Sequence, residues 1–196
     1  LLDALKKQDY QIKNGARFVR GEDIADFDFA HKYGSGWDWT WQVPRADFDN
    51  TLAQEAQRQG VDILFGAEVT SVTFKGTESQ TEIRFDDGTA LTVDANFIVD
   101  SSGFGRVLAK QLKLEAEPQI ASHSSIFTHI EDVRRPKTAL GTRITFEVIE
   151  QQVWFWYIPF SNGKTSIGFV GDHKWFQKFE GSNTQRLEAM MASSQH

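Results

Sequence analysis

The segment with the most distinctive chemistry spans residues 153–160 and reads VWFWYIPF. In a strand, alternate side chains lie on opposite faces. The two sets are then Trp154, Trp156 and Ile158 on one face and Phe155 and Tyr157 on the other. Both sets are apolar, so the strand is expected either to be covered on both sides or to line a ligand cavity with one face. Aromatic walls suit planar ligands, although the residues alone favour an ordinary core strand.

A second candidate lies at residues 98–105, which read IVDSSGFG. Small residues allow the backbone to turn tightly after an apolar strand, and a helix from about Arg106 to Leu112 would point free N–H groups at the loop. Such groups can hold a phosphate or another anion. The pattern is not a full G-x-G-x-x-G, because Leu108 stands at the third glycine. An ordinary strand–turn–helix connection is the alternative.

The third candidate is the junction at residues 41–49, WQVPRADFD, where a strand is expected to pass into a helix. Pro44 stops the strand and begins a helix that runs to about residue 59, with Gly60 after its end. Gln42 and Arg45 stand where their side chains could reach the polar groups of a ligand. The alternative is that they cap local backbone or face water.

Composition excludes several classes of function. The chain has no cysteine, so disulfides and thiolate metal sites are excluded, and its five histidines show no metal-ligand spacing, so no metal is expected. The net charge of −6 and the pI near 5.4, without a basic stripe, argue against binding to nucleic acid. No apolar run approaches the roughly 18 residues of a membrane helix, and no signal peptide is recognised. A cytoplasmic location without a membrane partner is therefore expected.

Two polar clusters carry no expected function. Glu131 and Asp132 fit a solvated turn, and residues 134–137, RRPK, fit a short basic loop at the surface.

The order of the expected elements predicts an α+β fold, with an α/β piece and an antiparallel β-sheet. Asp87-Gly88 and Asn162-Gly163 predict hairpin turns. Helices are expected at about 1–10, 45–59 and 106–112, and strands at 37–42, 60–65, 68–74, 81–85, 90–93, 96–100, 123–130, 142–149, 152–158 and 165–170.

The three candidate segments occur together, in this order, in the flavin-dependent halogenases, a tryptophan-halogenase-like family that the chain resembles over nearly its whole length. Residues 154–159, WFWYIP, match the W-x-W-x-I-P signature. Residues 41–49 resemble the family's Q-V-x-R-x-x-F-D segment, and residues 98–103 resemble its V-D-A-S-G segment, with Ser101 in place of Ala. A second W-x-W-x-V-P at residues 39–44 shows that an aromatic strand before a proline can mimic the signature.

The resemblance implies a parent enzyme that binds FAD, receives reduced flavin from a separate flavin reductase and uses oxygen to oxidise chloride or bromide. The resulting hypohalous acid would reach a lysine beside a small, electron-rich aromatic substrate. The implied cofactor-binding residues are Gln42, Arg45, Asp100 and Gly103. The implied wall on the substrate side consists of Trp154, Trp156, Ile158 and Pro159, and it keeps the substrate away from the flavin so that direct monooxygenation is suppressed.

The same resemblance, together with helical patterns at both ends, implies an internal fragment of a longer protein. Residues 1–44 would be a substrate-side segment, 45–115 the central part of an FAD-binding domain, and 116–196 the substrate-domain sheet and the start of a helix. The family's phosphate-binding glycines and its catalytic lysine would lie before residue 1, and a further flavin segment after residue 196. The fragment alone is therefore expected to be inactive and to bind FAD weakly at best.

Two other interpretations stay open. The V-D-A-S-G type is shared by the wider flavoprotein monooxygenase fold, so the parent could instead be an FAD-dependent hydroxylase or a geranylgeranyl-reductase-like oxidoreductase that does not halogenate. The other interpretation is a non-enzymatic, β-rich binding module whose aromatic strands are only core.

Overall fold

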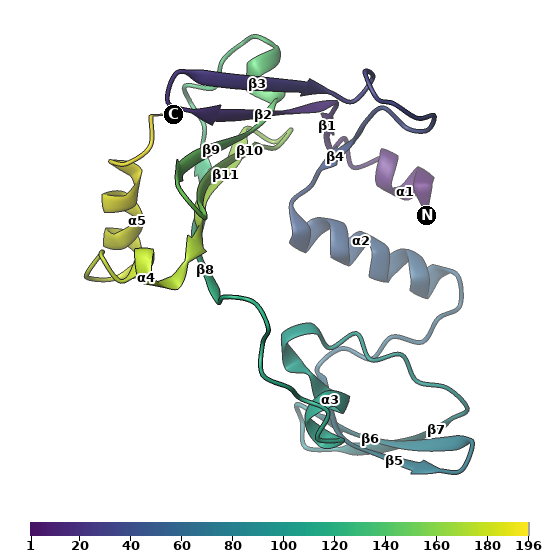
Figure 1. The fold of residues 1–196 in the computed structure, drawn as a ribbon. Helices are drawn as coiled ribbons and strands as arrows, with labels where there is room; N and C mark the ends of the chain where they lie inside the picture. The colour runs from purple at the N-terminus through teal and green to yellow at the C-terminus, as the bar shows by residue number, and fades with distance from the viewer. Residues whose placement is uncertain (196) are drawn as a thin grey trace. The chain divides into compact units, whose positions relative to one another are not determined.

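The computed structural model describes residues 1–195, which form two compact units (Figure 1). The first unit contains Leu1–Gln59 together with the chain from Ile120 onward, and the second contains Gly60–Gln119. The division of the sequence at residues 44 and 115 stays a prediction about the parent protein. In the structure, the helix after Pro44 belongs to the same compact unit as the residues before it.

The first unit is built on a six-stranded sheet with the order β3-β2-β9-β10-β11-β8. Its strands are β2 (Gly15–Arg20), β3 (Asp23–Asp28), β8 (His123–Glu131), β9 (Ile144–Glu150), β10 (Val153–Pro159) and β11 (Lys164–Asp172). All neighbouring pairs are antiparallel except β2 and β9, which run parallel. The expected sheet is therefore confirmed, with the addition of the parallel pair. The Asn162-Gly163 turn joins β10 to β11, and Gly163 has the positive φ of 84° that this turn requires.

Two helices cover one face of this sheet, α4 (His173–Phe176) and α5 (Asn183–Met191) (Figure 1). Asp172 caps α4 through its side chain, and Ser182 and Gln185 form a capping box at the start of α5. The core between sheet and helices consists of Val153, Phe155, Tyr157, Ile167, Phe169, Trp175, Phe176, Leu187 and Met190. These side chains form the apolar core between the sheet and the two helices.

A smaller part of the first unit holds the strand–helix junction. Strands β1 (Gln11–Lys13) and β4 (Thr40–Gln42) pair antiparallel, and α1 (Leu2–Lys6) contacts α2 (Arg45–Arg58). The helix expected at 45–59 is confirmed, whereas the one expected at 1–10 ends at Lys6. The strand expected at 37–42 is also shorter, because β1 offers only three residues to pair with, and Trp37 is left exposed.

The second unit is a three-stranded antiparallel sheet with one short helix. It contains β5 (Ala67–Lys75), β6 (Glu78–Phe85), β7 (Ala90–Ala95), the 3₁₀ turn η1 (Gly103–Gly105) and α3 (Val107–Gln111). The expected Asp87-Gly88 hairpin joins β6 to β7. The Gln111 amide accepts from the Val72 N–H at 2.9 Å and donates to the Val72 carbonyl, so that one side chain fastens α3 to β5.

Two expected strands are absent from the described residues. Residues 60–65 and 96–100 are irregular, because no strand between residues 1 and 195 pairs with them. Their apolar content predicts burial, yet the side chains of Val61, Leu64, Phe65, Phe97 and Val99 are exposed. Apolar content alone therefore did not predict pairing here: a strand needs a neighbouring backbone as well as apolar side chains.

Candidate functional site

The two faces of β10 have different surroundings. Val153 and Phe155 are at most 1% exposed under the helices, whereas Trp154 on the opposite face is 38% exposed. The predicted alternation is confirmed. Of the two expected arrangements, coverage on both sides is not found among the described residues, because α4 and α5 cover only the side of the odd-numbered residues. The other, in which one face lines a ligand cavity, stays a prediction.

The open face carries a row of aromatic rings that crosses the sheet. Register places Phe18 beside Phe146, Phe146 beside Trp156, and Gly168 between Trp156 and Phe127. The ring centroids of Phe18 and Phe146 lie 5.3 Å apart in a stacked arrangement, and those of Phe127 and Trp156 lie 5.9 Å apart. We call this surface the tryptophan face, and its members are Phe18, Phe127, Phe146, Trp154, Trp156 and Ile158.

Gly168 allows the Trp156 indole to lie over β11. A methyl group at Gly168 would lie 2.4 Å from the Phe127 Cβ and 2.6 Å from the Trp156 Cζ2, which no side chain tolerates without moving. The indole N–H donates to the Ser166 hydroxyl at 3.2 Å. The absence of a side chain at Gly168 and the hydrogen bond to Ser166 together orient the Trp156 ring.

Gln42 connects two of the candidate segments. Its amide Nε2 donates to the Pro159 carbonyl at 2.5 Å, which fastens the end of β10 to the end of β4. Gln42 is only 4% exposed, and its Oε1 is buried without a hydrogen-bond partner among residues 1–195. An unpaired buried acceptor is costly, so this oxygen is a candidate contact for a bound group.

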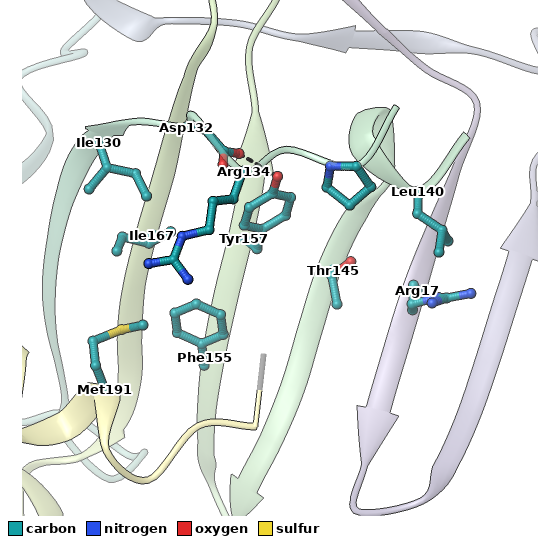
Figure 2. A pocket seen from close by; sticks show the side chains of 11 residues that line it. Arg17, Ile130, Asp132, Arg134, Leu140, Thr145, Phe155, Tyr157, Ile167 and Met191 are labelled. Carbon is teal, nitrogen blue, oxygen red and sulfur yellow. Dashed lines mark hydrogen bonds between the residues drawn. The ribbon is translucent and has the colours of Figure 1, made fainter. Parts of the chain in front are cut away.

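Asp132 and Arg135 hold the hairpin that follows the aromatic strand. The Asp132 Oδ2 accepts from the Tyr157 hydroxyl at 2.5 Å (Figure 2). It also accepts from the Thr165 hydroxyl at 2.7 Å. Arg135 pairs with Asp132 at 3.4 Å and donates to the carbonyls of Phe160 and Lys164, each at 2.7 Å. The expected solvated turn and surface loop are therefore wrong for these two residues, whose side chains are only 9% and 18% exposed.

This cluster shifts two pKa values. Burial acts to raise the pKa of Asp132, but hydrogen bonds from Tyr157, Thr165 and Arg135 outweigh burial and hold the pKa below its usual value. Burial, together with the bond to Asp132, raises the pKa of Tyr157. The stable form is thus an ionised Asp132 that accepts from a protonated Tyr157.

Arg45 lies on the surface of α2. Its guanidinium pairs with Asp49 one turn further along, at 3.0 Å, and the side chain is 77% exposed. Within residues 1–195, its side chain makes no hydrogen bond or ion pair with Gln42. Its predicted role toward a cofactor stays a prediction.

Asp100 organises the loop of the second unit. Its carboxylate accepts from the backbone N–H of Ser102 at 2.9 Å and of Leu108 at 3.0 Å, while the Ser102 hydroxyl accepts from the Val107 N–H. Hydrogen bonds from Ser102, followed by that from Leu108, lower the pKa of Asp100. The N–H groups of Val107 and Leu108, expected to be free for an anion, are therefore occupied by the chain itself.

Gly103 stands at the turn that follows. Its φ of +54° lies in the left-handed region, which favours glycine. Asp100 and Gly103 both belong to the second unit, and their predicted cofactor contacts stay predictions.

The described residues hold no group of three His, Cys, Asp or Glu side chains that could bind a metal ion. Within the same range, no helix is long and apolar enough to span a membrane.

Comparison with known proteins decides the family. The model of the tryptophan halogenase family matches residues 8–194. The chain belongs to this family. A flavin-dependent halogenase from Armillaria mellea is 29% identical over 66% of the chain, and a 1H-pyrrole-2-carbonyl-[peptidyl-carrier protein] brominase from Pseudoalteromonas luteoviolacea is 33% identical over 67% of it. The chain spans only 27% and 32% of the length of these two relatives.

Among solved structures, a flavoprotein/dehydrogenase from Cytophaga hutchinsonii is 48% identical and superposes with a TM-score of 0.94. That match covers all of this chain and 48% of the other. The predicted family and α+β fold are thereby confirmed.

Sequence reasoning missed two parts of the site. Phe18, Phe127 and Phe146 come from three separate strands, and only the sheet register brings them beside Trp156. Asp132 and Arg135 resembled an ordinary polar turn. The one signal in the sequence was that an acidic and a basic residue stand three positions apart, just before Pro136, where their side chains can pair.

Proposed function

We propose that the parent of this chain is an FAD-dependent halogenase and that the tryptophan face forms the wall on its substrate side. The observation that carries the proposal is the position of the two signature tryptophans. A strand that served only as core would turn them toward the helices, yet α4 and α5 cover the opposite face.

The orphaned oxygen of Gln42 fits a flavin. FAD offers donors for a buried amide oxygen, namely its ring N–H and the hydroxyls of its ribityl chain. Bound FAD, once reduced, would supply the activated oxygen that oxidises halide. Gln42 would accept a hydrogen bond from the cofactor while its Nε2 holds Pro159, so that cofactor and wall keep a fixed spacing.

The other predicted cofactor residues have more indirect roles in this proposal. Asp100 and Gly103 would shape the loop at residues 100–105 rather than offer it as a phosphate cradle. Arg45 would exchange its exposed partner Asp49 for an anionic group of the cofactor.

The tryptophan face would orient an electron-rich aromatic substrate and exclude water from it. Trp154, Trp156 and Ile158 present flat apolar surface, against which aromatic rings gain about 0.5–1.5 kcal/mol beyond area burial. The names of two relatives, the pyrrole brominase and a tryptophan 2-halogenase from Chondromyces crocatus, support an aromatic substrate. A halide and a separate flavin reductase complete the proposed set of partners, and a cytoplasmic location stays a prediction.

The decisive experiment uses the whole parent protein. It would be incubated with FAD, a flavin reductase, NADH, bromide and a panel of phenols, pyrroles and indoles. The proposal expects products with the bromine isotope doublet in the mass spectrum. Hydroxylated products without bromine across the whole panel would overturn it.

A non-halogenating oxidoreductase is the second candidate, favoured by the flavoprotein/dehydrogenase name of the 48% identical structure. Direct reduction of the bound flavin by NADPH, without a separate reductase, would support it. The 196-residue chain alone is expected to bind little FAD, and its isolation with stoichiometric yellow flavin would contradict that expectation.

A further inference from the structure

The turn between β10 and β11 exposes an Asn-Gly pair. Ser161, Asn162, Gly163 and Lys164 are all exposed. Gly163 has a φ of +84°, and apart from its chain neighbours no heavy atom would lie within 4 Å of a methyl group placed on it. The Lys164 N–H donates to the side-chain Oδ1 of Asn162 at 3.1 Å. The Asn162 amide is therefore folded back over its own turn, at a place where the backbone has room to move.

An Asn-Gly pair can change its own covalent structure. The backbone nitrogen of the glycine attacks the side-chain amide carbon of the asparagine, a new C–N bond forms, and the side-chain nitrogen leaves as ammonia. Water then opens the resulting succinimide ring at either carbonyl, which yields aspartate or isoaspartate. The reaction needs water alone, and glycine favours it because no side chain hinders the attacking nitrogen.

The chain contains a second Asn-Gly pair, Asn14-Gly15, in different surroundings. Gly15 is buried at the start of β2, within the antiparallel pairing of β2 with β3. The Asn14 carbonyl accepts from the Phe29 N–H at 2.9 Å, and the Arg143 guanidinium lies directly over Gly15. Closing the succinimide ring requires the backbone between the two residues to rotate, which would break these contacts. The fold should therefore protect this pair and leave the other free to react.

We propose that Asn162 is a modification site, at which spontaneous deamidation to isoaspartate loosens the hairpin of the aromatic strand. In isoaspartate the main chain runs through the former side chain, so the turn gains one backbone carbon. The Asp132 N–H and the Arg135 guanidinium donate to three backbone carbonyls that lie within two residues of Asn162. A longer turn moves these carbonyls away from their donors. The proposal does not depend on the proposed halogenation.

Two variants separate the consequences of the reaction. Aspartate, the other product, keeps the natural backbone length, and its carboxylate can accept from the Lys164 N–H as the amide does. Asn162→Asp therefore introduces the new charge without the extra backbone carbon. Asn162→Ser also offers an oxygen to the same N–H but has no amide to lose, so it is the variant that cannot be modified.

The test ages the parent protein in warm, mildly alkaline buffer, once folded and once in urea. Trypsin cuts after lysine and arginine, so it releases the two pairs in separate peptides, residues 14–17 and 144–164. Mass spectrometry detects the exchange of a side-chain NH₂ for OH in each peptide, and a protein isoaspartyl methyltransferase labels the isoaspartate. We expect deamidation of Asn162 to be severalfold faster than that of Asn14 in the folded protein, and the two rates to be similar in urea.

Loosening of the hairpin is measured by hydrogen exchange of the backbone amides in β10 and β11. These amides should exchange faster in the aged natural protein than in the fresh protein, in proportion to the isoaspartate content. Aged Asn162→Ser and fresh Asn162→Asp should both exchange as the fresh natural protein does.

Several results would overturn the proposal. If Asn162 stays intact in the folded protein but reacts in urea, the turn protects it. If Asn14 and Asn162 react at equal rates in the folded protein, their different surroundings have no influence. Unchanged exchange in a sample rich in isoaspartate would show that the hairpin tolerates the longer backbone. Equally faster exchange in aged Asn162→Ser would place the cause of loosening elsewhere in the chain.

Discussion

The two faces of β10 are almost equally apolar in sequence but differ in structure. Under the helices, the ring centroids of Phe155 and Phe169 lie 5.1 Å apart within the apolar core. On the other side, Trp154 and Phe127 remain 38% and 59% exposed. The difference teaches that hydrophobicity locates a strand, whereas the helices that follow it decide which face is core and which is free to meet a ligand.

The largest expected effect comes from a phenylalanine on the covered face. Phe169→Ala removes a side chain that is fully buried and should lower the free energy of unfolding by about 3–5 kcal/mol, because it leaves a cavity. Urea denaturation measures this change. The matched control, Phe127→Ala, removes the same residue type from the tryptophan face and should cost about 1 kcal/mol or less. Equal costs would show that the two faces are not distinct.

The next effect concerns the cluster that holds the hairpin behind the aromatic strand. Arg135→Met breaks the partly buried pair with Asp132 and frees two backbone carbonyls, so we expect a loss of about 2–3 kcal/mol in urea denaturation. Arg134→Met is the control, since Arg134 has no ion pair within the described residues. A loss of similar size in both variants would mean that charge in this loop, rather than the cluster, matters.

The same cluster predicts a dependence on pH. The pKa of Asp132 is lower in the folded state than in the unfolded chain, so its contribution to stability is fully present above the unfolded pKa, near 4. That contribution is lost as the pH falls through the lowered folded value. Asp132→Asn should therefore flatten the acid side of the stability curve, measured as unfolding free energy between pH 7 and pH 2. An unchanged slope would exclude Asp132 as its source.

A smaller loss of stability is expected at Gly168, the residue that leaves room for the Trp156 ring. Gly168→Ala places a methyl group against Trp156 and Phe127, and overpacking of this kind costs about 1–3 kcal/mol. The Trp156 indole N–H signal should move at the same time, because its bond to Ser166 is disturbed. Gly34→Ala has open space around the new methyl group and serves as the control. An unmoved Trp156 signal would show that Gly168 does not position this ring.

The smallest change in stability is expected for Trp154→Ala, about 1 kcal/mol or less, since the side chain is 38% exposed. In the parent protein, its effect should appear in the products instead. If the tryptophan face separates flavin from substrate, Trp154→Ala should raise the ratio of hydroxylated to brominated product, whereas Trp154→Phe should retain most of the natural ratio. Mass spectrometry of both products gives this ratio. An unchanged ratio in Trp154→Ala would show that Trp154 does not help to separate the flavin from the substrate.

Local signals in the sequence predicted the local structure well. The Asn162-Gly163 and Asp87-Gly88 turns, the helix after Pro44 and the alternation along β10 all follow from short-range backbone preferences, and all are present. These features needed no knowledge of distant residues.

Features that depend on distant partners could not be predicted in this way. The row from Phe18 to Phe127 and the bond from Gln42 to Pro159 join residues more than a hundred positions apart in sequence. Residues 96–100 have the composition of a buried strand but no described strand beside them. In each case the outcome depends on which distant segment lies beside the residue, and the periodicity of the sequence does not show this.

The parallel pairing of β2 with β9 has a consequence for how this chain emerges from the ribosome. Ala16 pairs with Ile144, so the large sheet cannot close until the entire unit Gly60–Gln119 has been synthesised. The β5-β6-β7 meander, by contrast, needs only contacts between adjacent segments, which form early and fast. Each nascent chain is therefore expected to carry the β2–β3 hairpin without its neighbour β9 through much of translation, while the smaller meander is already complete.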